Sequence, residues 1–134
     1  MGNRPADGSG AILLYRSEDG VHWSFVGTLD ACHNEYGRMW ECPDFFGLDG
    51  EHVLFVSPQE MKQMGLEFHV GNGTVCLMGD YDKASHKFDR KRVHAIDYGL
   101  DFYAPQHCDG ITFEAEGNVL MDVEKYDLTF DKEI

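Results

Sequence analysis

Glu41 stands in an unusual setting for a charged side chain. It lies within residues 38–46, RMWECPDFF, where aromatic and sulfur side chains dominate. Apolar neighbours disfavour the charged form of a carboxylic acid, and an acid that keeps its proton near neutral pH can donate that proton in catalysis. The run therefore indicates a general acid at Glu41. An exposed glutamate on the polar face of an alternating strand is the other interpretation that these residues allow.

Pro43 predicts a break in the strand beside this acid. Proline has no N–H to donate to a neighbouring strand, and it pushes the preceding residue towards extended geometry. We therefore expect an interrupted hydrogen-bonding ladder at this point, with Cys42 extended. Asp44 is expected to be a carboxylate at a strand end or turn and not a catalyst.

The cysteines and histidines show no spacing typical of a metal site or of a nucleophile paired with a base. No Cys-x-x-C pair occurs, and the seven histidines are not paired at ligand spacing. We expect no metal, no organic cofactor, surface positions for the histidines and free thiols, which favour a reducing compartment such as the cytoplasm. The cysteines are Cys32, Cys42, Cys76 and Cys108.

Short strands joined by tight turns must position these residues. Alternating apolar residues and turn residues predict strands at 11–16, 23–29, 38–46, 52–57, 74–81 and 87–96, arranged as three hairpins. Further short strands are expected around Phe102 and Tyr103, at 111–115 and at 118–123, and one weak helical turn at 59–65. The chain is therefore expected to be all-β.

Consecutive β-hairpins form the meanders from which β-sandwiches, β-barrels and β-propeller blades are built. A four-stranded propeller blade takes about 40 to 45 residues, so 134 residues hold roughly three blades' worth of antiparallel strands. This is fewer than the usual minimum of four blades in a closed ring. An incomplete β-propeller is the architecture we expect.

Composition limits the partners of the chain. Its 43% hydrophobic residues suffice for one core, and its length suits one domain or part of one. Eleven basic and twenty-four acidic residues give a net charge of −13, which repels nucleic acid and anionic lipid. No apolar run approaches the roughly 20 residues that cross a bilayer, and residues 1–10 contain no apolar signal core. We expect neither nucleic acid nor membrane as a partner.

Three segments resemble signatures of glycoside hydrolase family 32, the family of invertases, levanases, inulinases and sucrose-6-phosphate hydrolases. Residues 39–46, MWECPDFF, resemble its Glu-Cys-Pro motif, and residues 97–106, DYGLDFYAPQ, resemble a second signature downstream. Residues 10–17, GAILLYRS, followed by Trp23, resemble the stretch before the first. The segments stand in the family's order, and the resemblance covers about residues 9–106, whereas residues 107–134 diverge.

The resemblance implies a five-bladed β-propeller that cleaves β-fructofuranosyl bonds with retention. It implies that Glu41 acts as the general acid and then as the base. Asp101 and Tyr103, in the second signature, would line the sugar pocket. Trp40 and Cys42, which flank the acid, complete the expected substrate-binding set.

The family's nucleophilic aspartate belongs to an Asn-Asp-Pro-Asn motif, and a second aspartate, in an Arg-Asp-Pro motif, stabilises the transition state. Neither motif occurs in this sequence. We therefore expect residues 1–134 to be a partial propeller domain that carries the acid/base without the nucleophile, inactive alone, from a hydrolase of sucrose, sucrose phosphate or fructans. Exposed blade edges predict self-association. The alternative is a non-catalytic carbohydrate-binding or assembly module derived from such a propeller.

Overall fold

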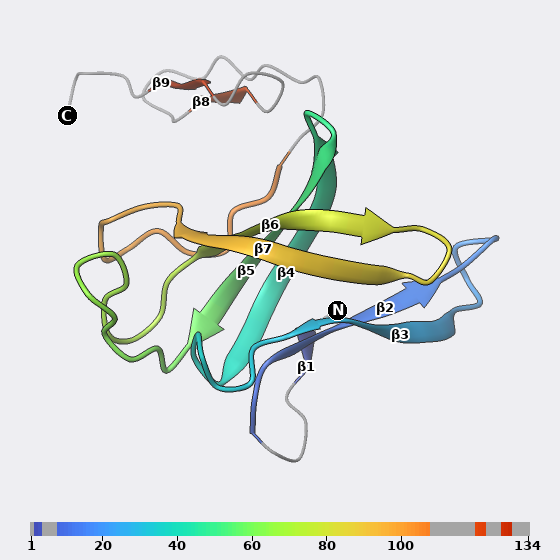
Figure 1. The fold of residues 1–134 in the computed structure, drawn as a ribbon, viewed down its shortest axis with the longest axis horizontal. Helices are drawn as coiled ribbons and strands as arrows, with labels where there is room; N and C mark the ends of the chain where they lie inside the picture. The colour runs from blue at the N-terminus through green and yellow to red at the C-terminus, as the bar shows by residue number, and fades with distance from the viewer. Residues whose placement is uncertain (1, 4–7, 108–119, 123–126, 130–134) are drawn as a thin grey trace.

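Nine β-strands and no helix make up the part of the chain that the computed structural model describes, residues 2–3, 8–107, 120–122 and 127–129 (Figure 1). The strands form three antiparallel sheets, β1-β2-β3, β4-β5-β6-β7 and β8-β9. The all-β prediction is confirmed. The strands are β1 (Gly2–Asn3), β2 (Ala11–Arg16), β3 (Ser24–Ala31), β4 (Met39–Leu48), β5 (Glu51–Gln59), β6 (Val75–Asp82), β7 (Lys87–Ala95), β8 (Leu120–Asp122) and β9 (Asp127–Thr129).

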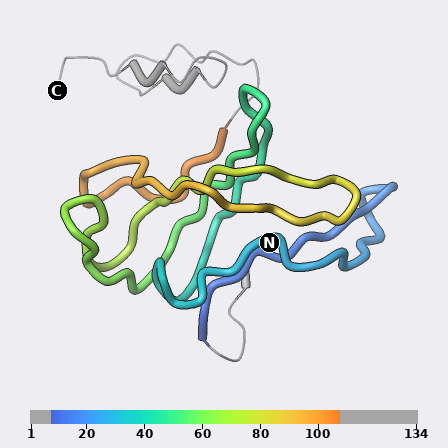
Figure 2. Tube along the Cα trace, in the orientation of Figure 1, coloured from blue at the N-terminus to red at the C-terminus, as the bar shows by residue number. Residues whose placement is uncertain are grey.

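The β4–β7 sheet is an up-and-down meander of four strands, as expected for one propeller blade. The six strands predicted between residues 11 and 96 are confirmed to within two residues at each end, and so are their three hairpins. Asp49 and Gly50 turn β4 into β5 with φ values of 49° and 86°. Positive φ at both central residues is what a type I′ hairpin turn requires, and Asp-Gly tolerates it. The tip of this hairpin projects beyond the β6–β7 pair (Figure 2).

Two predicted elements are wrong. Residues 59–65 form no helical turn, because the chain folds back on itself through isolated bridges between Met61 and Gly71 and between Met64 and Phe68. This extended arrangement buries Met61 and Phe68 in the core. The segment around Phe102 and Tyr103 is not a strand. The predicted strand at 111–115 lies outside the described residues, and β8 falls within the one predicted at 118–123.

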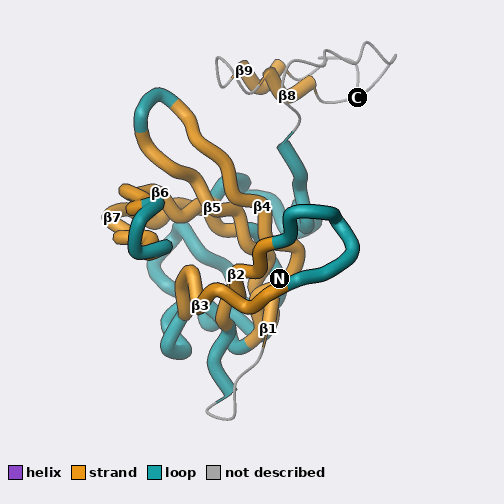
Figure 3. The backbone as a smooth tube through the Cα atoms, turned by 90° about the vertical axis from the view of Figure 1, so that its right-hand side faces the viewer, coloured by secondary structure: helices purple, strands orange, loops and turns teal. Residues whose placement is uncertain are grey.

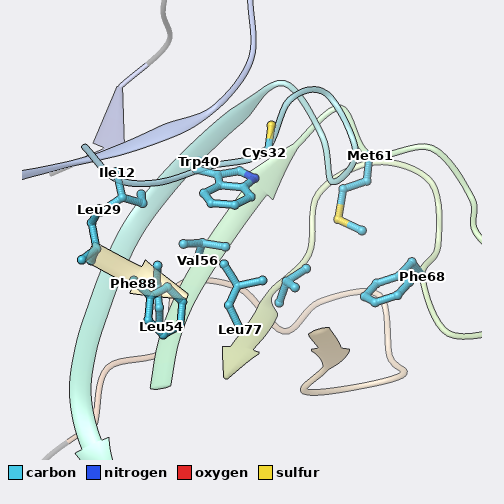
Figure 4. Close-up of a cluster of buried hydrophobic side chains, with 11 residues drawn as sticks. Ile12, Leu29, Cys32, Trp40, Leu54, Val56, Met61, Phe68, Leu77 and Phe88 are labelled. Atoms are coloured by element: carbon cyan, nitrogen blue, oxygen red, sulfur yellow. The ribbon is translucent and has the colours of Figure 1, made fainter. Parts of the chain in front are cut away.

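The β1–β3 and β4–β7 sheets pack against each other through one apolar cluster (Figure 4). In the view of Figure 3, β1–β3 lie below β4–β7, with loops joining the strands. Ile12 and Leu29 come from the smaller sheet and meet a set from the larger one, namely Trp40, Leu54, Val56, Leu77 and Phe88. Alternate residues of β4 and β5 therefore face this shared core, and the residues between them face the other side of the sheet.

The opposite face of the β4–β7 sheet carries a second, smaller cluster. Phe46, Val53, Phe55 and Cys76 form it, and Leu48, Met78 and Ile96 pack around them. The segment 97–107 returns across the β4–β5 pair on this face, as the hydrogen bonds described below show (Figure 2). This second face carries the functional candidates.

Three cysteines lie within the described residues, and all three are free thiols. Cys32 and Cys76 are buried and Cys42 is exposed, whereas Cys108 lies outside the described residues. Burial raises the pKa of the Cys76 thiol to about 11. Over the same part of the chain, no helix exists that is long and apolar enough to span a membrane.

Candidate active site

The carboxylate of Glu41 is held through one of its two oxygens. Tyr103 donates its hydroxyl hydrogen to Oε2 at 2.7 Å, and the side-chain amide of Gln59 donates to the same oxygen at 2.9 Å. Gln59 comes from β5, the partner strand of β4, whereas Tyr103 lies far along the chain. The other oxygen, Oε1, has no hydrogen-bond partner among the described residues. The arrangement therefore leaves one oxygen of a fixed carboxylate available to a ligand.

Two aromatic neighbours of Glu41 along the strand, Trp40 and Phe45, lie on the opposite face of the sheet. Trp40 is fully buried in the cluster between the sheets, where its Nε1 donates to the carbonyl oxygen of Tyr36 at 2.7 Å. Phe45 packs against the same cluster. Because successive residues of a strand point to opposite faces, these rings cannot desolvate Glu41 as we expected. Trp40 also has no exposed surface on which a sugar could stack, so the structure assigns it to the core.

A β-bulge follows Glu41, as Pro43 predicted. Glu41 pairs with Ser57 and Asp44 pairs with Phe55, so that Cys42 and Pro43 together stand opposite one residue of β5. The bulge keeps Glu41 and Asp44 on the same face, although residues three apart in a regular strand face opposite sides. Cys42 has a φ of 45°, so the expectation of an extended residue before proline is wrong. The interruption of the ladder is confirmed.

Tyr103 reaches Glu41 from the second signature segment. Its side chain is 37% exposed, and burial, followed by the hydrogen bond and negative charge of Glu41, raises its pKa to about 12. Asp101, in the same segment, is exposed and makes no hydrogen bond to Glu41. Cys42 is exposed beside the acid, and its charge is a minor further cause of the raised pKa of Tyr103. Of the expected pocket residues, the structure thus brings Tyr103 into direct contact with Glu41.

Sequence reasoning missed the contact of Gln59 with Glu41 and the pairing of Asp44 with His107 on this face. Gln59 could have been found from the hairpin register, since it lies two residues beyond the partner of Glu41 on β5. Asp44 was expected at a strand end or turn and His107 at the surface, and both expectations are wrong. Asp44 is buried inside β4, and its carboxylate accepts a hydrogen bond from the backbone N–H of His107, whose side chain is largely buried. No local signal links these two, because 63 positions separate them.

No group of three or more histidine, cysteine, aspartate or glutamate side chains within the described ranges is arranged to hold a metal ion. A carboxylate with one tethered oxygen and one open oxygen can exchange a proton with a bound ligand.

Comparison with known proteins shows the family of the chain. The family model "Glycosyl hydrolases family 32 N-terminal domain" matches residues 1–121. A sucrose-6-phosphate hydrolase of Staphylococcus xylosus is 41% identical over 97 residues, which cover 72% of this chain and 20% of that protein. A raffinose invertase of Escherichia coli is 39% identical over 109 residues, which cover 79% of this chain and 22% of that protein.

A solved structure of the Bombyx mori GH32 beta-fructofuranosidase BmSUC1 superimposes with a TM-score of 0.73 at 34% identity, covering 87% of this chain and 24% of the other. A second solved structure of the insect enzyme is a complex with sucrose. The chain thus spans about a fifth to a quarter of the length of the relatives it matches. The four-stranded β4–β7 sheet is a propeller blade, and the chain belongs to glycoside hydrolase family 32.

Proposed function

We propose that this chain carries the acid/base part of a retaining β-fructofuranosidase-like hydrolase that acts on sucrose, sucrose phosphate or fructans. The observation that carries the proposal is the tethered carboxylate of Glu41, which Tyr103 and Gln59 hold through Oε2 beside the Cys-Pro bulge. The names of the relatives, sucrose-6-phosphate hydrolase and raffinose invertase, support the substrate class.

In this mechanism Glu41 acts twice. Its open oxygen, Oε1, first donates a proton to the glycosidic oxygen as the bond to the leaving group breaks. In the second step the same oxygen accepts a proton from the water that releases the sugar from its nucleophile. Both steps use Oε1. Because hydrogen bonds to Oε2 hold the side chain of Glu41 in place, Oε1 stays in position for both steps.

The nucleophile of this reaction is a second carboxylate, about 5 to 5.5 Å from the acid/base in retaining enzymes. The sequence has neither the Asn-Asp-Pro-Asn nor the Arg-Asp-Pro motif. We therefore propose that these 134 residues supply no nucleophile and that the chain alone does not turn over fructosides. Hydrolysis of sucrose, sucrose 6-phosphate or inulin by the purified chain, abolished by Glu41→Gln, would contradict this point.

The acid/base role is best tested where a nucleophile is present. Residues 9–106 can replace the matching segment of the Staphylococcus xylosus sucrose-6-phosphate hydrolase, which is 41% identical. We expect the chimera to hydrolyse its substrate and Glu41→Ala to abolish this activity. With an aryl β-fructofuranoside, whose leaving group needs no proton, azide is expected to restore turnover of the variant and to give a fructosyl azide of retained configuration. Glu18→Ala, at an exposed site in the β2–β3 hairpin, is the matched control and is expected to retain activity.

A non-catalytic carbohydrate-binding module is the competing function. It predicts that the purified chain binds fructose or a fructan and that Tyr103→Ala weakens the binding, while the Glu41→Ala chimera shows no azide rescue. Isothermal titration of the chain together with the chimera assay separates the two functions, because azide restores turnover to the Glu41→Ala chimera only if Glu41 is the acid/base.

We also propose self-association through the β2–β3 hairpin. Val21, Trp23 and Phe25 are 74%, 62% and 59% exposed there, and Trp23 lines a hollow of about 540 Å³ with Leu13, Leu14 and Tyr15. A contiguous apolar face of this kind favours contact with another surface. Light scattering is expected to detect oligomers that Trp23→Ser disperses and that Leu66→Ser, at an exposed loop site, leaves intact. A monodisperse monomer would contradict the proposal.

A further inference from the structure

Asp44 and His107 form a partly hidden polar pair beside the Glu41 site. The backbone N–H of His107 donates to Oδ2 of Asp44 at 2.5 Å, and Nδ1 of its ring lies 2.8 Å from both carboxylate oxygens. The ring stacks on Phe46 with 3.9 Å between centroids. The side chains are only 10% and 17% exposed. His107 is thus fixed to β4 by hydrogen bonds and by ring contact.

The segment that ends at His107 is not part of a sheet, so side chains must hold it in place. Thr74 donates its hydroxyl hydrogen to the carbonyl oxygen of Phe102 at 3.3 Å, and the N–H of Ala104 donates to Oγ of Ser57 at 3.0 Å. These two bonds are between neutral groups. The bonds to Asp44 involve a carboxylate, and such charge-assisted bonds are about twice as strong as neutral ones. The Asp44–His107 pair is therefore a stronger attachment than either of these two.

The bulge after Glu41 determines where the Asp44–His107 pair forms. By keeping Asp44 on the same face as Glu41, it lets β4 bind the returning segment at two points, through Asp44 to His107 and through Glu41 to Tyr103. The second point is the contact of the proposed acid/base. The segment from Tyr103 to His107 is only five residues long, so displacement at one end moves the other.

We propose that Asp44 and His107 are positioning residues of the Glu41 site, which hold the hydroxyl of Tyr103 on Oε2 and so keep Oε1 directed to the substrate. The catalytic consequence rests on the function proposed above, whereas the positioning itself can be measured in the chain as it stands.

Titration of Tyr103 reports its contact with Glu41. The pKa of Tyr103, about 12, is raised by burial and then by the Glu41 hydrogen bond and charge. Loss of the Asp44–His107 pair exposes the phenol of Tyr103 and separates it from the carboxylate of Glu41. Both the burial and the interaction with Glu41 that raise the pKa of Tyr103 then weaken. In the 134-residue chain with ¹³C-labelled tyrosine, we expect Asp44→Ala and His107→Ala to lower the pKa of Tyr103 towards the ordinary value of about 10.

A conservative variant distinguishes positioning from general stability. In His107→Asn the amide nitrogen takes the place of Nδ1 and can still donate to Asp44, so we expect the pKa of Tyr103 to remain near 12. Asp82→Ala is the matched control: it removes a carboxylate that bonds Ala84 and Ser85 in the β6–β7 turn, and it is expected to leave the Tyr103 titration unchanged.

Folded Asp44→Ala and His107→Ala chains with the wild-type Tyr103 titration would overturn the proposal. If either single variant fails to fold, the double variant Asp44→Asn with His107→Ala, which leaves no uncompensated buried carboxylate, takes its place. Failure of the double variant to fold would also contradict a positioning role and show a structural one. The titration does not depend on hydrolysis. A negative chimera assay therefore contradicts the proposed acid/base function, whereas a negative titration contradicts the positioning role.

Discussion

The phenol of Tyr103 and the carboxylate of Glu41 are 2.7 Å apart although 62 positions separate them in the sequence. The hydroxyl is the donor, and it shares Oε2 with the amide of Gln59. The link joins two segments of the chain that each resemble a family 32 signature. Its effect on the pKa of Tyr103 leads to the first two predictions that follow.

Replacement of Glu41 by glutamine should lower the pKa of Tyr103. The substitution removes the negative charge that disfavours tyrosinate, while the desolvation of the phenol, the largest cause, remains. The pKa is therefore expected to fall from about 12 to a value still above 10. Tyrosine-selective NMR measures it, with Tyr103→Phe assigning the resonance. Glu18→Gln is the control, and an unchanged pKa in Glu41→Gln would show that the two groups do not interact in solution.

Stability should fall between about pH 10 and pH 12. The unfolded chain releases the Tyr103 proton near pH 10, whereas the folded chain keeps it until about pH 12. Between these values the folded state binds more protons than the unfolded state, so the free energy of unfolding decreases as pH rises. The contribution is fully present below pH 10. Urea unfolding across this range measures it, and Tyr103→Phe is expected to show a shallower decrease than the wild type.

Trp40→Ala should destabilise the fold by about 3–5 kcal/mol, because it opens a cavity in the core between the two sheets. Trp40 is fully buried and bonded to the backbone of Tyr36. Leu66→Ala is the control, since Leu66 is 98% exposed in a loop, and its effect is expected to stay within about 0.5 kcal/mol. Urea unfolding gives both values. Equal effects of the two substitutions would show that the sheets do not pack in solution as they do here.

Gly37→Ala should perturb the start of β4 and with it the Glu41 site. Gly37 has a φ of 73°, and a Cβ there would lie 2.4 Å from the carbonyl oxygen of Gln59, the residue that holds Glu41. Gly50→Ala is the control, since Gly50 has a φ of 86° with open space around it. The control should cost about 1 kcal/mol for backbone strain alone. Thermal unfolding is expected to show a larger loss for Gly37→Ala, and equal losses would contradict the close contact.

Much of the fold follows from local patterns. Alternating apolar residues gave the six strands between residues 11 and 96, and Asp49-Gly50 gave the hairpin turn between β4 and β5. Pro43 gave the interruption of the ladder. These features depend on side-chain direction and backbone freedom within a few residues, so they can be recognised without knowledge of the rest of the molecule.

The candidate site could be predicted only in part. The sequence around Glu41 indicated a candidate acid. Trp40 and Phe45 beside it, however, pack in the core between the two sheets. Which face of β4 is buried depends on where the β1–β3 sheet packs, and that packing places Trp40 inside. The left-handed backbone of Cys42 depends on the geometry of the bulge, which the preference of the residue before proline did not indicate.

The sequence by itself determined the all-β class, the six strands between residues 11 and 96 and the identity of the acid candidate, because these depend on short-range periodicity and on motif letters. Only the tertiary structure decided that Gln59 and Tyr103 share one oxygen of Glu41 and that Asp44 binds His107. These contacts join separate strands or segments up to 63 residues apart. They depend on the register set by the bulge and on the path of a returning segment, which local preferences do not encode.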